Sequence, residues 1–157
     1  MKTVSLTLAA LIAATPLAAQ SLRDCNTFEA NARNIYGPYA ETIRDYANGA
    51  IRVIALDTAE PACCSYHVMV NHPAGDDPYQ ICTLISRDDQ MGFSALFMDR
   101  VEASYDPATG LTVTLPTGRW DEAAGIMHEE MLAFTVNQAA GTVTLAAPGG
   151  ATPGASK

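Results

Sequence analysis

Four cysteines carry the most definite chemistry in this 157-residue chain. They are Cys25, Cys63, Cys64 and Cys82, an even set without a Cys-x-x-Cys pair, which predicts disulfides rather than a thioredoxin-type redox centre. A disulfide between neighbouring residues closes a very small ring and usually needs a distorted peptide. We therefore expect Cys63 and Cys64 to bond different partners, one taking Cys25 and the other Cys82. The alternative is a vicinal Cys63–Cys64 disulfide that acts as a redox switch.

A second group able to do chemistry consists of His67, Met69 and His72. Residues i and i+2 of a strand share a face, so His67 and Met69 are expected to point together, and imidazole with thioether suits copper. The segment His67-Val68-Met69 resembles the His-x-Met end of the motif in periplasmic copper chaperones, whose upstream His and Met have no counterpart in residues 20–66. The competing interpretation is structural, with Met69 in the core and His67 half-buried in a strand.

The remaining polar clusters indicate little catalytic chemistry. His128-Glu129-Glu130 holds a base and two acids but lacks His-Glu-x-x-His. Gly92-Phe93-Ser94 departs from the Gly-x-Ser-x-Gly nucleophile elbow at its last glycine. Asp76-Asp77 is the best of several acidic pairs for calcium, yet no Asp-x-Asp-x-Asp-Gly loop is present and a solvated turn explains it equally. We predict a protein that is not an enzyme and has no cofactor, with a hydrolase centred on His128 as a minor alternative.

Arg119 and Trp120 are the best candidates for protein binding. They stand in a segment with turn chemistry, and Trp, Tyr and Arg dominate interface hot spots. The competing interpretation places Trp120 as a core residue between the sheet and a loop.

Charge excludes one class of partner. The formal net charge is −8, the lysines are only Lys2 and Lys157, and the arginines are scattered without a basic run. The sequence therefore lacks the basic cluster that nucleic-acid binding through phosphate neutralisation requires. An acidic surface suits a basic protein partner, although it also serves plain solubility.

The first residues predict the compartment. Lys2 precedes the largely apolar run 4–14 and the small-residue exit 15–19, which together are typical of a secretory signal peptide over residues 1–19. The run is shorter than the about 20 residues of a spanning helix, so we expect a periplasmic or secreted protein without a membrane span. Residues 20–147 form one predicted globular domain, and the Pro/Gly/Ala-rich residues 148–157 a disordered tail.

The hydrophobic patterns predict an α+β fold that is mostly antiparallel β. Apolar residues at steps of three and four predict helices over 27–36 and 38–47, or one kinked helix. Alternating and β-branched runs then predict about seven strands, over residues 50–56, 65–71, 79–86, 93–105, 111–115, 131–136 and 142–146. The secondary structure of residues 117–129 is ambiguous, and the sequence fits either a loop or a short helix. The helical segment is expected to pack on a meandering sheet that is open, rolled into a barrel or folded as a sandwich.

Together these features predict an exported, disulfide-stabilised, non-catalytic binding or accessory domain. One form of this function is an acidic inhibitor or partner of a basic protein of the cell envelope. The alternative is a periplasmic copper- or zinc-binding protein that uses His67, Met69 and His72.

Overall fold

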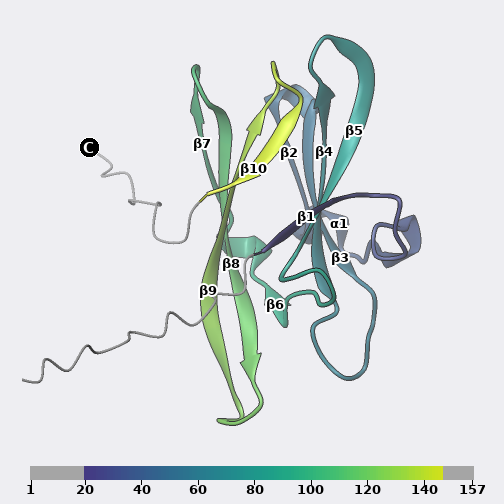
Figure 1. The fold of residues 1–157 in the computed structure, drawn as a ribbon, viewed down its shortest axis with the longest axis vertical. Coiled ribbons are helices and arrows are strands. Elements are labelled where there is room, and N and C mark those ends of the chain that lie inside the picture. Colours follow the sequence, from purple (N-terminus) through teal and green to yellow (C-terminus); the bar gives the residue numbers. More distant parts are fainter. Residues whose placement is uncertain (1–19, 147–157) are drawn as a thin grey trace, which may run out of the picture.

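Two antiparallel sheets pack face to face in the computed structural model, which describes residues 20–146 (Figure 1). The prediction of a mostly antiparallel β fold is confirmed, and the sandwich is the form that the sheets take. The predicted signal peptide, residues 1–19, and the predicted tail, residues 148–157, lie outside the described residues.

The first sheet has five strands in the order β1-β5-β4-β3-β2. Its central strands β3, β4 and β5 follow one another along the chain as a meander, and the short strands β1 and β2 close its two edges. The strand bounds are β1 (Ser21–Asp24), β2 (Ile43–Tyr46), β3 (Ile51–Asp57), β4 (Tyr66–Ala74) and β5 (Asp77–Ser86).

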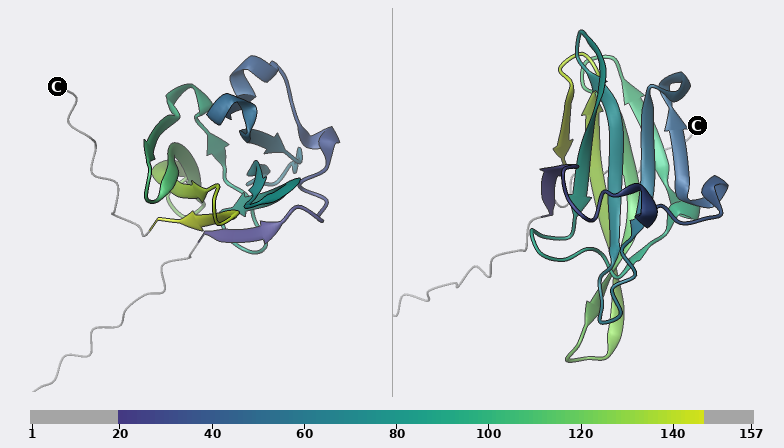
Figure 2. Two further views of the ribbon diagram at one scale, coloured as in Figure 1. Left: turned by 90° about the horizontal axis from the view of Figure 1, so that it is seen from above. Right: turned by 90° about the vertical axis from the view of Figure 1, so that its right-hand side faces the viewer.

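The second sheet is built around one long strand, β8 (Gly110–Asp121), which pairs with three others. One edge of β8 pairs along its whole length with β9 (Ile126–Asn137), and the other edge pairs with β6 (Ala95–Leu96) and β7 (Glu102–Asp106). The strand β10 (Thr142–Leu145) pairs with β9 at the outside of the sheet. The far end of the β8–β9 hairpin extends beyond the first sheet (Figures 1 and 2).

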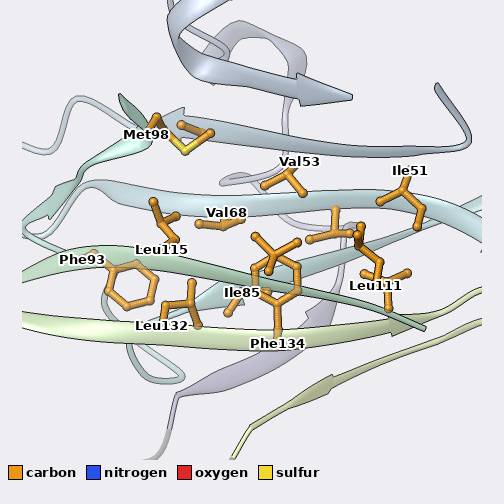
Figure 3. Packing of buried hydrophobic residues seen from close by; sticks show 14 residues of the cluster. Ile51, Val53, Val68, Ile85, Phe93, Met98, Leu111, Leu115, Leu132 and Phe134 are labelled. Carbon is orange, nitrogen blue, oxygen red and sulfur yellow. The ribbon is translucent and has the colours of Figure 1, made fainter. Parts of the chain in front are cut away.

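The main core lies between the sheets and comes from alternate residues of the strands (Figure 3). In β3, Ile51, Val53 and Ala55 face the second sheet, as the alternating pattern predicts. Strands β8 and β9 pack against these residues from the second sheet. Their fully or almost fully buried side chains are Leu111, Val113, Leu115, Leu132, Phe134 and Val136. Burial of these side chains supplies most of the hydrophobic driving force, at about 25 cal/mol per Å² of apolar surface.

A second, smaller apolar cluster covers the outer face of the first sheet. It contains Ile54, Leu56, Met69 and Leu84, and the chain between β1 and β2 packs on it through Cys25, Ala30, Ile35 and Ile43. The N-terminal segment therefore does cover one sheet face, as expected.

The conformation of this N-terminal segment differs from the prediction. Instead of helices over 27–36 and 38–47, it holds a 3-10 turn, η1 (Ala32–Asn34), and a single helical turn, α1 (Tyr39–Thr42), which leads directly into β2. The buried Asn34 side chain donates hydrogen bonds to the carbonyls of residues 28 and 29, at 2.8 and 3.0 Å. Further along the segment, Ile35 forms a β-bridge to Leu56, and β2 pairs with β3. These contacts provide backbone hydrogen bonds that a helix would otherwise supply. Tertiary pairing thus overrides the helical periodicity.

The strand count also differs from the prediction, since residues 20–146 hold ten strands where about seven were expected. Strand β1 and strand β2 were not expected, and residues 93–105 divide into β6 and β7 at a 3-10 turn, η3 (Met98–Arg100). Another 3-10 turn, η2 (Ala47–Gly49), separates β2 from β3. The ambiguous residues 117–129 contain no helix; they are the projecting end of the β8–β9 hairpin, with its turn at residues 122–125.

None of the helices within residues 20–146 has both the length and the apolar character needed to cross a membrane.

Replacing Phe134 by alanine tests the assignment of the core. Phe134 is fully buried between the sheets, and Phe→Ala in a packed core costs about 3–5 kcal/mol of unfolding free energy. We expect a loss of that size in urea denaturation. Tyr105→Ala is the control, because Tyr105 is 66% exposed on β7 and surface changes stay within about 0.5 kcal/mol. Equal losses in the two variants would contradict this core.

Candidate functional site

All four cysteines are paired, but not as expected. Cys25 bonds Cys82, and the neighbours Cys63 and Cys64 bond each other. The prediction that Cys63 and Cys64 take different partners is therefore wrong, and the bond of the vicinal alternative is the one observed. The reason is strand β1, whose register puts Asp24 opposite Thr83 and so carries Cys25 next to Cys82. The bond between these two ties the N-terminal segment to β5.

The vicinal disulfide lies in the β3–β4 loop beside Ser94. The loop is closed at its base, where Thr58 N donates to Ser65 O at 3.0 Å. Ser94 Oγ is 3.5 Å from Cys64 Sγ and 3.7 Å from Cys63 Sγ. The same oxygen accepts a hydrogen bond from Trp120 N at 2.9 Å. Ser94 therefore joins the disulfide to the backbone of the β8–β9 hairpin.

Cys63 and Cys64 also line an open surface pocket of about 270 Å³. Its wall includes two exposed apolar side chains, Phe28 and Met91, which are 56% and 44% exposed. Polar groups complete the lining, namely Glu29, Thr58, Glu60, His67 and Gln90. Small molecules or side chains that enter this pocket therefore meet the disulfide directly.

Gly92 brings the β5–β6 connection close enough to form this pocket. A Cβ at position 92 would lie 2.3 Å from Tyr66 O and 2.5 Å from Cys64 O, so only glycine fits here. The next residue, Phe93, is bridged to Tyr66 by two backbone hydrogen bonds, at 2.7 and 3.2 Å. The turn before it is held by Asp88 Oδ1, which accepts from the backbone of residues 90 and 91.

His67 forms the inner end of a polar chain below the pocket. Its Nδ1 lies 2.8 Å from Ser86 Oγ, which accepts from Arg23 Nη2 at 3.1 Å. Arg23 in turn pairs with Glu29 at 3.5 Å. Burial lowers the pKa of His67, partly offset by the nearby Glu29, so the ring is neutral at neutral pH. The partly buried strand histidine of the structural interpretation is thus an almost fully buried, hydrogen-bonded one.

The three residues of the proposed metal site do not converge. His67 and Met69 share the outer face of β4, as predicted, and Met69 is buried in the second apolar cluster. His72 has the opposite parity and faces the other side of the sheet, where its Nε2 lies 3.0 Å from Thr83 Oγ1. Among residues 20–146, no three His, Cys, Asp or Glu side chains are grouped so as to hold a metal ion. The prediction of a joint site at these three residues is therefore wrong.

Trp120 lies on an apolar face at the end of the β8–β9 hairpin. It stands directly opposite Met127 in the ladder, and Pro116 stands opposite Met131. Strand alternation puts these side chains on one side of the ribbon, opposite to the core-facing Leu132. Trp120, Met127 and Met131 are 43%, 46% and 52% exposed. We call these three residues the hairpin face, and Trp120 is not the core residue of the competing interpretation.

Arg119 points to the other side of the same ribbon. It forms an ion pair with Glu130 on the facing strand, and an exposed pair of this kind contributes little stability. Arg119 and Trp120 are therefore adjacent in sequence but lie on opposite faces. The residues of the hairpin face that the sequence did not single out are Met127, whose segment had no predicted strand, and Met131, which only began the predicted strand 131–136. Ser94 was visible only as part of an incomplete nucleophile elbow.

The weaker candidates take structural positions. His128 Nε2 lies 3.4 Å from Asp121 Oδ2 on the ribbon, and within residues 20–146 no hydroxyl or thiol group hydrogen-bonds to its ring. Asp77 Oδ1 accepts from Tyr79 N at 2.9 Å, which is the turn role expected for the Asp76-Asp77 pair.

The chain matches no family model, and no curated protein or solved structure matches it.

Removing each disulfide in turn tests how much each one contributes to the unfolding free energy. The Cys25–Cys82 bond joins residues 57 apart, whereas Cys63–Cys64 joins neighbours. Loop-closure entropy therefore predicts a loss of about 2–4 kcal/mol of unfolding free energy for C25S/C82S, and less than about 1 kcal/mol for C63S/C64S. Urea denaturation without reductant measures both. A larger loss for C63S/C64S would show that the vicinal bond holds the fold together.

The buried histidines predict a pH dependence of stability. Burial lowers the pKa of both His67 and His72 in the folded protein, whereas the unfolded chain titrates near about 6.5. Below that pH the unfolded state binds more protons, so the unfolding free energy falls as pH decreases from about 7.5 towards the folded-state pKa values. His72→Gln should reduce this slope in urea denaturation series. An unchanged slope would assign the effect to other groups.

Proposed function

We propose that the protein is an exported, non-catalytic accessory domain that binds a basic partner protein through the end of its β8–β9 hairpin. The hairpin face is the observation that carries this proposal. Trp120 lies opposite Met127, Met131 follows on the same face beyond Glu129, and each of the three is more than 40% exposed on a ribbon that extends past the core.

The composition of the hairpin face suits protein recognition. Tryptophan is the residue most enriched in interface hot spots, and methionine adapts its shape to a partner surface. Gly118 allows the Met127 thioether to lie across the strand, since a Cβ there would be 2.6 Å from Met127 Sδ. The Met127 side chain therefore lies against the ribbon opposite Trp120, and a shallow apolar pocket on a partner would cover these two residues.

Charged groups around the hairpin face indicate a partner with basic groups at its rim. The end of the ribbon carries Asp121, Glu122, Glu129 and Glu130. Arg100 holds Glu129 with two hydrogen bonds, at 3.0 and 2.8 Å, and Arg119 pairs with Glu130. The carboxylates outnumber the arginines here, and the chain as a whole carries a formal charge of −8. A cationic rim would therefore be attracted to this end.

Export is supported by two separate observations. Disulfides persist in oxidising compartments, and all four cysteines are paired. Residues 1–19 have the pattern of a cleavable secretory signal. A periplasmic or secreted location follows from the two together, and an envelope protein is the expected class of partner.

A pull-down from a native periplasmic extract tests the proposed function. The processed protein serves as bait, bound proteins are eluted along a salt gradient, and mass spectrometry identifies them. We expect one stoichiometric partner that moderate salt releases, because exposed charges are screened beyond about 8–10 Å at physiological ionic strength. The bait variant W120A/M127A should reduce the recovery at least about tenfold, as expected for loss of a hot spot.

Tyr105→Ala is the matched control for this experiment. Tyr105 is also an exposed aromatic residue of the second sheet but lies on β7, away from the hairpin face. Its variant should capture the partner as the unchanged protein does. Equal capture by W120A/M127A, or no partner at any salt concentration, would overturn the proposal.

A further inference from the structure

We infer that Cys63–Cys64 is a thiol-exchange site, reduced by an incoming dithiol in the pocket, and that its redox state is transmitted through Ser94 to the Trp120 end of the β8–β9 hairpin. The site is separate from the hairpin face. Its consequence for partner binding rests on the proposed function, whereas its chemistry does not.

The position of this bond in the chain indicates a role other than holding the fold together. A disulfide stabilises mainly by constraining the unfolded chain, and the constraint grows with the length of the closed loop. Cys63 and Cys64 are adjacent, so almost no chain is constrained. Cys25–Cys82, with a separation of 57 residues, already ties the N-terminal segment to the sheet. Reduction of Cys63–Cys64 therefore leaves the framework of the fold intact.

The site is accessible and its backbone is held in an unfavourable conformation. Both cysteines are partly exposed, and both line the open pocket between Phe28 and Met91. Cys64 has φ = +68°, in the left-handed region that is unfavourable for L residues other than glycine. Opening the ring removes the covalent link between neighbours, so the loop can relax. Accessible disulfides in such settings are the exchangeable ones.

The hydrogen-bond roles of Ser94 change when the bond is reduced. Ser94 Oγ accepts the Trp120 N–H at 2.9 Å, and its own proton points to sulfur atoms 3.5 and 3.7 Å away. A disulfide sulfur carries no hydrogen, so in the oxidised protein it can only accept. A thiol can also donate. After reduction, a cysteine S–H can donate to the second lone pair of the serine oxygen. The Ser94 O–H then turns away from the sulfur atoms, Trp120 N–H shares its acceptor with a second donor, and the link to the hairpin weakens.

The exchange reaction is a transfer of two electrons and two protons. A thiolate of the incoming dithiol attacks one sulfur of the pair, the Cys63–Cys64 bond breaks, and its electron pair leaves on the other sulfur, which takes up a proton. The second thiol of the reductant then attacks the mixed disulfide and releases the first cysteine as a thiol. The dithiol is oxidised to a disulfide, and Cys63 and Cys64 become two thiols.

Differential alkylation of the oxidised, processed protein tests the exchange itself. The protein is titrated with dithiothreitol under native conditions, quenched with acid and alkylated, and peptides are read by mass spectrometry. We expect Cys63 and Cys64 to be labelled at a dithiol concentration at least about tenfold lower than Cys25 and Cys82. Circular dichroism should show an unchanged fold at that point. Simultaneous reduction of both bonds, or reduction only on unfolding, would overturn the inference.

Amide hydrogen exchange measured by NMR tests the transmission to the hairpin. Trp120 is the only tryptophan, and its N–H bonds Ser94 Oγ rather than a strand carbonyl. Its exchange should be about fivefold faster or more after selective reduction, since one hydrogen bond is weakened. The Phe97 amide, which donates to Pro116 O at 3.0 Å across the same strand border, should not change.

Two variants separate the steps. In Ser94→Ala the Trp120 amide should exchange fast in the oxidised protein and show no further change on reduction, while Cys63 and Cys64 still react. In C63S/C64S the dithiol should leave Trp120 unaffected. A Trp120 response that persists in Ser94→Ala would overturn the serine link. None of these measurements uses the partner protein, so their failure is distinct from a failure of the proposed function.

Discussion

The pairing of β8 with β9 over eleven facing positions is the constraint on which the second sheet and the candidate sites depend. Over its first half, this ladder supplies the inner side chains from Leu111 to Leu115 and from Leu132 to Val136, which fill the core. Over its second half the same alternation places Trp120 and Met127 on the face of the ribbon that points away from the core, where both are exposed. One continuous hydrogen-bonded ribbon thus carries both the core and an exposed apolar end.

The first sheet has a corresponding division between its two faces. Its inner face belongs to the main core, and its outer face would be an apolar surface in water without the N-terminal segment. That segment needs no regular helix to cover it. Side chains such as Asn34 satisfy its backbone carbonyls, and Cys25–Cys82 holds it against β5. A disulfide is well suited to this role because an irregular segment has few backbone hydrogen bonds of its own to the sheet.

The two candidate sites meet at the border between β6 and β8. Ser94 N donates to Gly118 O at 2.9 Å, and Ser94 Oγ accepts from Trp120 N at 2.9 Å, so one residue fixes the strand border on both sides of Arg119. Its hydroxyl also faces the vicinal disulfide. The β3–β4 loop, whose vicinal disulfide constrains almost no chain, is thereby connected to the end of the ribbon that carries the hairpin face. This proximity gives a covalent change in the β3–β4 loop a short physical route to the hairpin.

Local patterns in the sequence determined the β-rich class, the inner residues of β3 and the turn role of Asp76-Asp77, because strand alternation and turn chemistry are properties of neighbouring residues. They also placed His67 and Met69 on one face of a strand. Tertiary structure decided what depends on contacts between distant residues. Strand β1 selected Cys82 as the partner of Cys25, and sheet pairing ended the helix of residues 39–42 after one turn and made residues 43–46 a strand. The packing of the sheets left Trp120 exposed on the face of the ribbon that points away from the core, since burial depends on what lies against a residue and not on its type.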